Sequence, residues 1–167
     1  MSKVLNFDQS TKLSAYSLWI DGQYKESGCI DLHKIKDTSE RVRAMGVELC
    51  KIIEKYSPDK VVLEEVAQQS NALTLKLLAR IQGIIIGFCA AHNIETYIVE
   101  PSKWRSKLHF KLGSGVKREE LKAQAIQYIK NVYGLELSED ECEAICIGDA
   151  AHKIYNFSDE EDIWGEK

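Results

Sequence analysis

The chain contains 167 residues, 44% of them hydrophobic, which is enough for one domain with a full core and too little for two ordinary ones. It shows no basic-then-apolar start and no run of about 20 uninterrupted apolar residues, so we expect no secretory leader, no membrane span and a cytoplasmic location. The net charge of −4, taken alone, argues against a nucleic-acid partner.

The first 30 residues predict three antiparallel strands. An apolar run from Val4 ends in the carboxylate Asp8. A second strand over residues 13–20 is joined by the tight-turn pair Asp21-Gly22 to a third strand over residues 23–30. An unpaired buried carboxylate costs on the order of several kcal/mol unless it has a partner or binds a metal. Asp8 is therefore a candidate site residue.

The next segment repeats this pattern of an apolar strand that ends in an acid. A helix is predicted from a cap at Thr38 or Ser39 to Tyr56, with apolar residues at helical spacing. A strand follows over residues 60–64, and its continuous apolar run is typical of a central strand covered on both faces. This strand ends in Glu64. If it lies beside the first strand in parallel, Asp8 and Glu64 meet at one edge of the sheet.

The segment 71–92 predicts a long helix whose apolar residues form two stripes. One stripe contains Leu73, Leu77, Ile81, Ile84 and Phe88, and the other contains Leu75, Leu78, Ile85, Ile86 and Cys89. One stripe can face the sheet, and the second needs another cover. That cover is either a neighbouring helix of the same chain or a second copy of the protein, and we expect a homodimer through this helix.

The C-terminal half predicts one more strand, at residues 95–99, and three helices. A short helix begins at Pro101, a second runs from Val116 to Tyr133 after a glycine-serine hinge at 113–115, and a third runs from a cap at Ser138 to about residue 156. Residues 1–156 form the predicted domain, and 157–167 an acidic C-terminal tail from which Trp164 could dock. Three antiparallel strands followed by alternating helices and strands indicate an α/β three-layer fold, with a mixed five-stranded sheet and helices on both faces.

The charges of this half are separated along the chain. Residues 103–122 contain seven basic and two acidic residues, whereas residues 136–167 contain eleven acidic residues and two lysines. A basic segment beside a carboxylate cluster is what a metal-dependent phosphodiesterase needs, because one gathers phosphates and the other holds metals. The ordinary alternative is a solvated surface with an acidic tail. The candidate DNA-binding residues are Lys103, Arg105, Lys107, Lys111, Lys117, Arg118 and Lys122.

The candidate catalytic and metal-binding residues are four acids: Asp8, Glu64, Asp140 and Glu143. Phosphodiester hydrolysis at neutral pH is served by two Mg²⁺ ions about 3.5–4 Å apart, which take hard oxygen ligands, and Mn²⁺ can substitute. Asp140 and Glu143 are three residues apart and share a helix face, whereas Asp149 lies on the opposite side and ranks lower. The sequence leaves open whether Glu65, Asp140 or Asp149 completes the metal site. Taken singly, each acid could equally be a turn cap, a rim charge or a favourable acid at a helix N-terminus.

At these residues the chain resembles the RuvC-type Holliday junction resolvases, which belong to the RNase H-like superfamily. The stretch Pro58-Asp59-Lys-Val-Val-Leu-Glu64-Glu-Val66, with Asn71 and Leu75-Lys76-Leu77 downstream, is similar to the second acidic strand of that family and its following helix. Phe7-Asp8-Gln9-Ser10 is similar to the first motif, and Asp140-x-x-Glu143-Ala144-Ile145 to the terminal one. The similarity runs from about residue 3 to residue 152.

The resemblance implies an RNase H-like fold and a homodimeric, Mg²⁺-dependent endonuclease (crossover junction resolvase) that makes paired nicks in four-way DNA junctions during recombination and repair. It also implies that Lys117, after the glycine-serine hinge, helps to hold DNA phosphates, with Arg118 assisting. The nearest type of relative is a bacteriophage RuvC.

The chain departs from the family pattern at three places. Gln9-Ser10 stands where a glycine is usual, and the last acid is Glu143 instead of aspartate. Ala67-Gln68 stands where bacterial relatives carry an aromatic residue that wedges into the junction. The missing aromatic residue favours a broader range of branched DNA substrates. The departures at Gln9-Ser10 and Glu143 keep open a catalytically idle branched-DNA binding protein, and a nucleotide-binding fragment of the actin and sugar-kinase fold is a more distant alternative.

Overall fold

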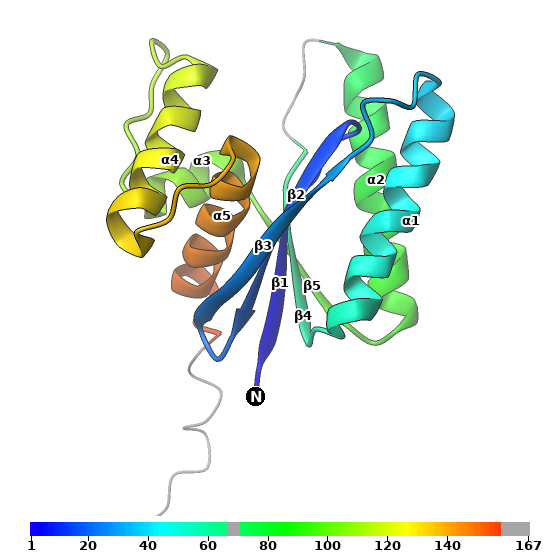
Figure 1. The fold of residues 1–167 in the computed structure, drawn as a ribbon, viewed down its shortest axis with the longest axis horizontal. Coiled ribbons are helices and arrows are strands. Elements are labelled where there is room, and N and C mark those ends of the chain that lie inside the picture. Colours follow the sequence, from blue (N-terminus) through cyan, green and yellow to red (C-terminus); the bar gives the residue numbers. More distant parts are fainter. Residues whose placement is uncertain (67–70, 158–167) are drawn as a thin grey trace, which may run out of the picture.

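A computed structural model describes residues 1–66 and 71–157, and its centre is a five-stranded mixed sheet in the order β3-β2-β1-β4-β5 (Figure 1). Strand β1 pairs with β2 in antiparallel orientation and with β4 in parallel orientation. The strands are β1 Lys3–Asp8, β2 Leu13–Ile20, β3 Gln23–Asp31, β4 Lys60–Glu64 and β5 Glu95–Val99. The predicted strand set and the predicted β1–β4 pairing are both confirmed.

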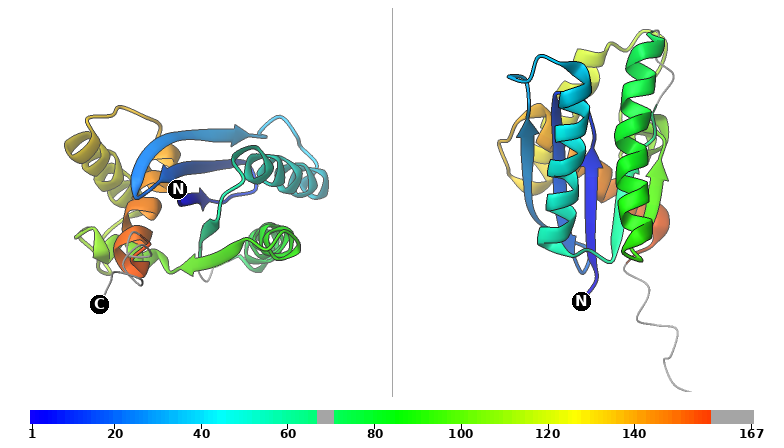
Figure 2. Two further views of the ribbon diagram at one scale, coloured as in Figure 1. Left: turned by 90° about the horizontal axis from the view of Figure 1, so that it is seen from below. Right: turned by 90° about the vertical axis from the view of Figure 1, so that its right-hand side faces the viewer.

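Helices cover both faces of this sheet, as predicted. The helices are α1 Thr38–Tyr56, α2 Ala72–Ala91, α3 Pro101–Lys107, α4 Arg118–Tyr133 and α5 Glu139–Tyr155. The right panel of Figure 2 shows α1 and α2 side by side over one face, whereas Figure 1 places α5 on the other face with α3 and α4 outside it. The sheet is thus the middle of three layers.

The face under α1 and α2 has a core in which Leu5, Phe7, Met45, Leu49 and Ile81 are fully buried. The two predicted stripes of α2 are wrong in detail, because the residues that pack on the sheet form one row between them. That row takes two members from each stripe and consists of Leu77, Ile81, Ile85 and Cys89. The other predicted members lie on its flanks, and some of them remain exposed.

By length and composition alone, α2 is also apolar enough to cross a membrane, with a mean hydropathy of 1.6 over its best window. A single helix of this kind is weak evidence, because buried helices in the cores of globular proteins pass the same test. Lys76 and Arg80 interrupt its apolar sequence. The buried row packs against the sheet and accounts for part of the apolar character of α2, since 17% of the apolar window is buried.

Helix α5 holds the opposite face together. Every residue from Cys142 to Ala151 is buried, and Trp104 and Ile145 are fully buried in the same core. Gly148 lets the helix approach the sheet closely, because an added Cβ would collide with the Trp19 indole and lie 2.8 Å from Asn6 Nδ2. This close approach fixes the height at which the N-terminal turn of α5 meets the ends of β1 and β4.

Three predicted boundaries shift in the structure. Asp37, not Thr38 or Ser39, caps α1, and its side chain accepts a 2.7 Å hydrogen bond from the Glu40 backbone N–H. Helix α4 begins at Arg118, two residues later than predicted. Phe157, which the sequence placed in the acidic tail, is 5% exposed and packs against Tyr155 and Tyr97. The predicted docking of Trp164 lies outside the described residues.

Candidate active site

Two of the candidate acids end adjacent parallel strands. In the β1–β4 register Phe7 is paired with Leu63, so the next residues, Asp8 and Glu64, sit side by side at the carboxyl ends of the strands. Carboxyl ends of neighbouring parallel strands point to the same edge of a sheet. The sequence pattern of an apolar strand closed by an acid therefore gives two carboxylates at one place.

The other two acids come from the first turns of α5. Ser138 caps this helix, and its side chain accepts a hydrogen bond from the Glu141 backbone N–H. Asp140 and Glu143 then project toward the end of β1. Carboxylate oxygens of Asp8, Asp140 and Glu143 lie within 4.8 Å of one another. Three hard oxygen donors from distant parts of the sequence thus converge in one group, a donor set that fits a divalent cation such as Mg²⁺.

Glu64 lies beside this group of three and is held by different contacts. Its Oε1 accepts a 2.7 Å hydrogen bond from Trp104 Nε1 and is 3.7 Å from a guanidinium nitrogen of Arg105. Its backbone carbonyl accepts hydrogen bonds from the side-chain amides of Gln9 and Gln82. The backbone and the carboxylate of Glu64 are therefore both fixed by neighbours that fold against the end of β4.

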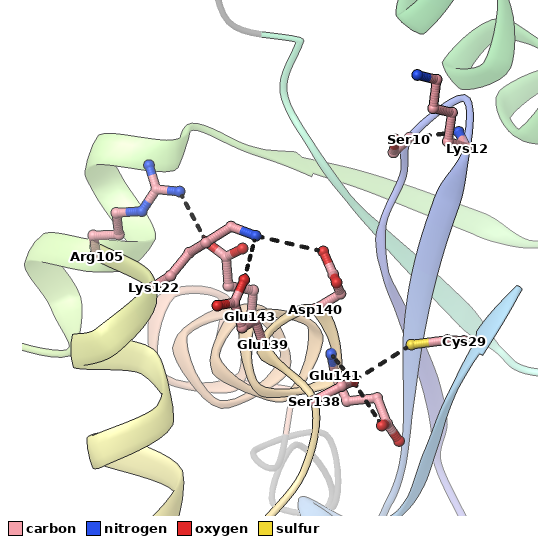
Figure 3. Close-up of polar contacts among 10 residues, drawn as sticks. All are labelled: Ser10, Lys12, Cys29, Arg105, Lys122, Ser138, Glu139, Asp140, Glu141 and Glu143. Atoms are coloured by element: carbon pink, nitrogen blue, oxygen red, sulfur yellow. Dashed lines mark hydrogen bonds and ion pairs between the residues drawn. The ribbon is translucent and has the colours of Figure 1, made fainter. Parts of the chain in front are cut away.

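Two basic side chains predicted to bind DNA reach these carboxylates instead of lying free on the surface (Figure 3). Arg105 is 3.4 Å from Glu143 Oε1 as well as 3.7 Å from Glu64. Lys122 pairs with Glu139 at 2.7 Å and lies 3.9 Å from Asp140. Arg105 and Lys122 therefore balance part of the negative charge of the site.

The electrostatics of Asp8 show how concentrated the negative charge is. The pKa of Asp8 is raised well above its ordinary value, first because the carboxyl is buried and then because the charges of Glu64, Glu143 and Asp140 repel its ionised form. Arg105 opposes this shift. Crowded ionised carboxylates repel one another, and the single positive charge of Arg105 offsets only part of this repulsion. The arrangement therefore favours binding of a divalent cation.

Burial also raises the pKa values of Glu64 and Glu143. The Trp104 hydrogen bond and then the Arg105 charge oppose the shift at Glu64. Arg105 and then Lys122 oppose it at Glu143. The surrounding donors thus hold these carboxylates closer to the ionised form that metal binding requires.

The remaining acids have other partners. Asp149, ranked lower from helix geometry, is buried on the side of α5 that faces α4, where it pairs with Lys153 at 3.0 Å and accepts a hydrogen bond from the Tyr128 hydroxyl. Glu65 accepts hydrogen bonds from its neighbour's backbone N–H and from Gln82. Among the described residues, neither acid belongs to the group that could hold an ion.

Sequence reasoning missed three residues that support the site. Trp104, Gln9 and Gln82 carry no charge, and only their folded positions connect them with Glu64. Gln9 had one usable signal, since it stands next to a candidate acid where a smaller residue is usual. Trp104 had a weaker one, because it follows a strand end and lies beside a basic residue.

Five of the predicted DNA-binding residues remain exposed. They lie on α3, on the loop that follows it and at the start of α4, and they are Lys103, Lys107, Lys111, Lys117 and Arg118. This segment borders the carboxylates, since α3 also provides Arg105 and α4 provides Lys122. The charge separation seen in the sequence therefore becomes a basic border beside an acidic centre.

A family model described as "Lactococcus phage M3 protein" matches residues 1–159. The chain belongs to this family. The family takes its description from a protein of a Lactococcus phage, which supports the predicted bacteriophage type.

Among curated proteins, the chain is similar to bacterial proteins named crossover junction endodeoxyribonuclease RuvC. It is 28% identical over 138 residues to the one from Caldicellulosiruptor saccharolyticus, covering 80% of each chain. It is 24% identical over 132 residues to the one from Alkaliphilus oremlandii, covering 79% of each. The M3 family chain is therefore related to RuvC endonucleases at about 25% identity.

Solved structures give the same result for the fold. Thermus thermophilus RuvC in complex with a Holliday junction substrate superposes with a TM-score of 0.72 at 12% identity, covering 95% of this chain and 98% of that one. The Fowlpox virus resolvase in complex with Holliday junction DNA superposes with a TM-score of 0.63 at 18% identity, covering 92% and 98%. The predicted RNase H-like, RuvC-type fold is confirmed. The predicted absence of an aromatic wedge at Ala67-Gln68 falls outside the described residues.

Proposed function

We propose that this protein is a Mg²⁺-dependent, structure-selective endonuclease that resolves four-way DNA junctions by paired phosphodiester nicks and also cuts other branched DNA. The observation that carries the proposal is the convergence of Asp8, Asp140 and Glu143 within 4.8 Å in a RuvC-type fold. Support also comes from the Thermus and Fowlpox structures of that fold, which contain Holliday junction DNA.

Asp8, Asp140 and Glu143, with Glu64 beside them, would hold the metal. Bound Mg²⁺ supplies Lewis acidity, which makes a water molecule a better nucleophile and stabilises the charge that develops on the leaving oxygen. The protein's own part is to orient four carboxylates, of which Glu143 is buried and Asp8, Glu64 and Asp140 are half-buried. Trp104 fixes one oxygen of Glu64. A bound cation would relieve the repulsion from neighbouring carboxylates that, after burial, raises the pKa of Asp8.

Arg105 would turn from the carboxylates to the DNA when metal binds. Its contacts with Glu64 and Glu143 are long, at 3.7 and 3.4 Å, and its buried Nε has no hydrogen-bond partner among the described residues. Contacts of this length suit a guanidinium that exchanges a carboxylate for a phosphate while it stays over the Trp104 ring, 4.6 Å from the ring centroid. Lys117 and Arg118 would bind neighbouring phosphates at the start of α4.

Paired nicks need two active sites, and we propose a homodimer through α2. The outer side of this helix exposes Leu73 (59%) and Ile84 (36%). An added Cβ at Gly83 or Gly87 would meet nothing within 4 Å, so a second helix could approach the backbone there. A cavity of about 470 Å³ between α1 and α2, lined in part by Val47 and Ile84, continues this apolar face.

The deciding experiment compares the parent with Asp8→Asn on a radiolabelled four-way junction. We expect the parent to give symmetric nicks that require Mg²⁺ or Mn²⁺. The variant should bind the junction at least as well and cut it at least about a thousandfold more slowly, because removing a central group of this kind costs several kcal/mol of transition-state stabilisation. Equal cleavage by both proteins would refute the proposed activity.

A catalytically idle branched-DNA binding protein is the second candidate. The observation that favours it is Arg105, which already places a positive charge between Glu64 and Glu143. Gel shifts of the junction without any Mg²⁺- or Mn²⁺-dependent product, over a range of ion concentrations, would support this candidate over the nuclease.

A further inference from the structure

A cavity lined by basic side chains lies on the side of α3 that is opposite to the carboxylates. Trp104 and Arg105 face Glu64, whereas Lys103, Ser106 and Lys107 line a cavity of about 890 Å³. Residues 106 and 107 follow Lys103 by three and four positions, so the three side chains share one face of the helix. The described residues that line the cavity include three lysines and a histidine and no acid.

The cavity is formed by segments far apart in the sequence. Helix α5 contributes Lys153, α4 contributes Tyr128, and His109 is the second residue after the end of α3. Lys153 is anchored at 3.0 Å from Asp149 and at 3.1 Å from the Tyr128 hydroxyl, so its ammonium group is held at the cavity wall and its charge is partly balanced. Lys103 and Lys107 are exposed, with Lys103 lying 5.7 Å from the centre of the Tyr155 ring.

His109 lies in the turn that ends α3. Its backbone has a φ of 61°, in the left-handed region that non-glycine residues rarely adopt. This conformation is common just after the C-terminus of a helix, and the His109 backbone N–H donates a 3.0 Å hydrogen bond to the Ser106 carbonyl. His109 lines the cavity together with the three lysines.

We infer that this cavity binds the phosphodiester backbone of a DNA arm away from the point of cleavage, an inference that rests on the proposed function. Glu143 and Lys153 are ten residues apart on α5, which is about 15 Å along a helix axis. A DNA strand advances about 3.4 Å per nucleotide along its axis. The bound phosphate therefore belongs about four or five nucleotides from the one that is cut.

The test is a double-mutant cycle, in which lysines of the cavity are replaced in the protein and single phosphates are neutralised in the DNA. The variant is Lys103→Gln with Lys107→Gln, and the control is Lys25→Gln with Lys51→Gln, which removes the same charge from β3 and α1. Binding to an intact four-way junction is measured in EDTA, so that the DNA stays uncut. Each junction carries one uncharged methylphosphonate, placed two to eight nucleotides from the cleavage position.

We expect the parent and control to lose affinity severalfold when the methylphosphonate is four or five nucleotides away, and the cavity variant to show no such loss. The variant's slope of log affinity against log salt should also be smaller by about 0.9 for each phosphate contact removed. Unchanged melting temperature would show that the fold is intact, and His109→Gly gives a second cavity variant if the lysine pair does not fold.

The outcomes separate this inference from the proposed function. A parent that nicks junctions but shows the same methylphosphonate profile as the cavity variant overturns the inference alone. A parent that binds no branched DNA overturns both. Inorganic phosphate that shifts the His109 resonances at millimolar concentration, together with a flat methylphosphonate profile, would assign the cavity to a small anion and also overturn it.

Discussion

The indole N–H of Trp104 donates a 2.7 Å hydrogen bond to Oε1 of Glu64, which joins a fully buried aromatic residue on α3 to an acid at the end of β4. Replacing Trp104 with phenylalanine keeps most of the buried volume and removes the donor. We expect the Mg²⁺-dependent nicking rate to fall about tenfold to a hundredfold, since groups that orient metal ligands typically have effects of this size.

The pH profile distinguishes positioning from simple loss of packing. The Trp104 hydrogen bond lowers the pKa of Glu64, against the larger effect of burial, so Trp104→Phe should shift the acidic limb of the rate profile to higher pH. Trp19→Phe is the matched control, because Trp19 is also buried and donates to Ser17. A loss of rate that is equal in the two variants, without a pH shift, would assign Trp104 a packing role only.

Asp8→Asn should make the metal-free protein more stable at neutral pH. The folded-state pKa of Asp8 is raised above that of the unfolded chain, so its contribution to stability is present below pH about 4 and is lost as pH rises through the folded pKa. Asparagine does not ionise, so the variant does not lose this stability as the pH rises. In EDTA, we expect a higher melting temperature at pH 7.5, by about 2–4 °C for each kcal/mol released, and little difference at pH 4.

The control for this measurement is Asp31→Asn. Asp31 is exposed, and the hydrogen bonds from His33 lower the pKa of its carboxyl, so the same substitution should give no gain at neutral pH. Mg²⁺ should then raise the melting temperature of the parent and not that of Asp8→Asn. A melting temperature that falls equally at both pH values on replacing Asp8 would show that the carboxylate is structural.

Much of this architecture could be predicted from the sequence because its signals are local. Apolar runs that end in Asp8 and Glu64 predict strand ends, and Ser138 predicts the start of α5. Two failures have a common physical cause. The row of α2 that faces the sheet, including Ile85, depends on how the helix is rotated against β1 and β4, and the indole of Trp104 reaches Glu64 only after α3 docks. Neither orientation is encoded in a short segment.

Arg105→Gln should bind divalent cations more tightly and cut more slowly. The guanidinium lies 3.7 Å from Glu64 and 3.4 Å from Glu143, so a metal ion must compete with it. Without this charge, we expect the affinity for Mg²⁺ or Mn²⁺, measured by calorimetry, to rise severalfold to tenfold, the latter being about 1.4 kcal/mol. The nicking rate should nevertheless fall, because a phosphate contact is lost.

Lys130→Gln is a control with an equal charge change, since Lys130 pairs with Glu136 on the exposed side of α4. Metal affinity in this variant should match that of the parent. If Arg105→Gln also leaves metal affinity unchanged, the ion pairs with Glu64 and Glu143 do not compete with the metal, and the idle-binder candidate loses its main support.

The dimer proposal is tested by changing the outer side of α2. We expect the parent to sediment as a dimer of the 19.0 kDa chain. Gly83→Leu should give a monomer, because the added side chain would keep a second helix at a distance. The substitution should not destabilise the monomer itself: an added Cβ at Gly83 meets nothing within 4 Å, and glycine inside a helix costs about 0.5–1 kcal/mol relative to alanine.

A matched pair of charge substitutions locates the interface independently. Leu73 on α2 and Val132 on α4 are apolar and similarly exposed, at 59% and 53%, and Figure 1 places their helices on opposite sides of the sheet. Leu73→Lys should weaken the dimer, whereas Val132→Lys should leave it unchanged. The monomeric variants should still bind a junction and make single nicks, because the four carboxylates all belong to one chain. If the protein remains a dimer with both Gly83→Leu and Leu73→Lys, the dimer forms through another face. Paired nicking by a monomeric parent would show that no dimer is needed.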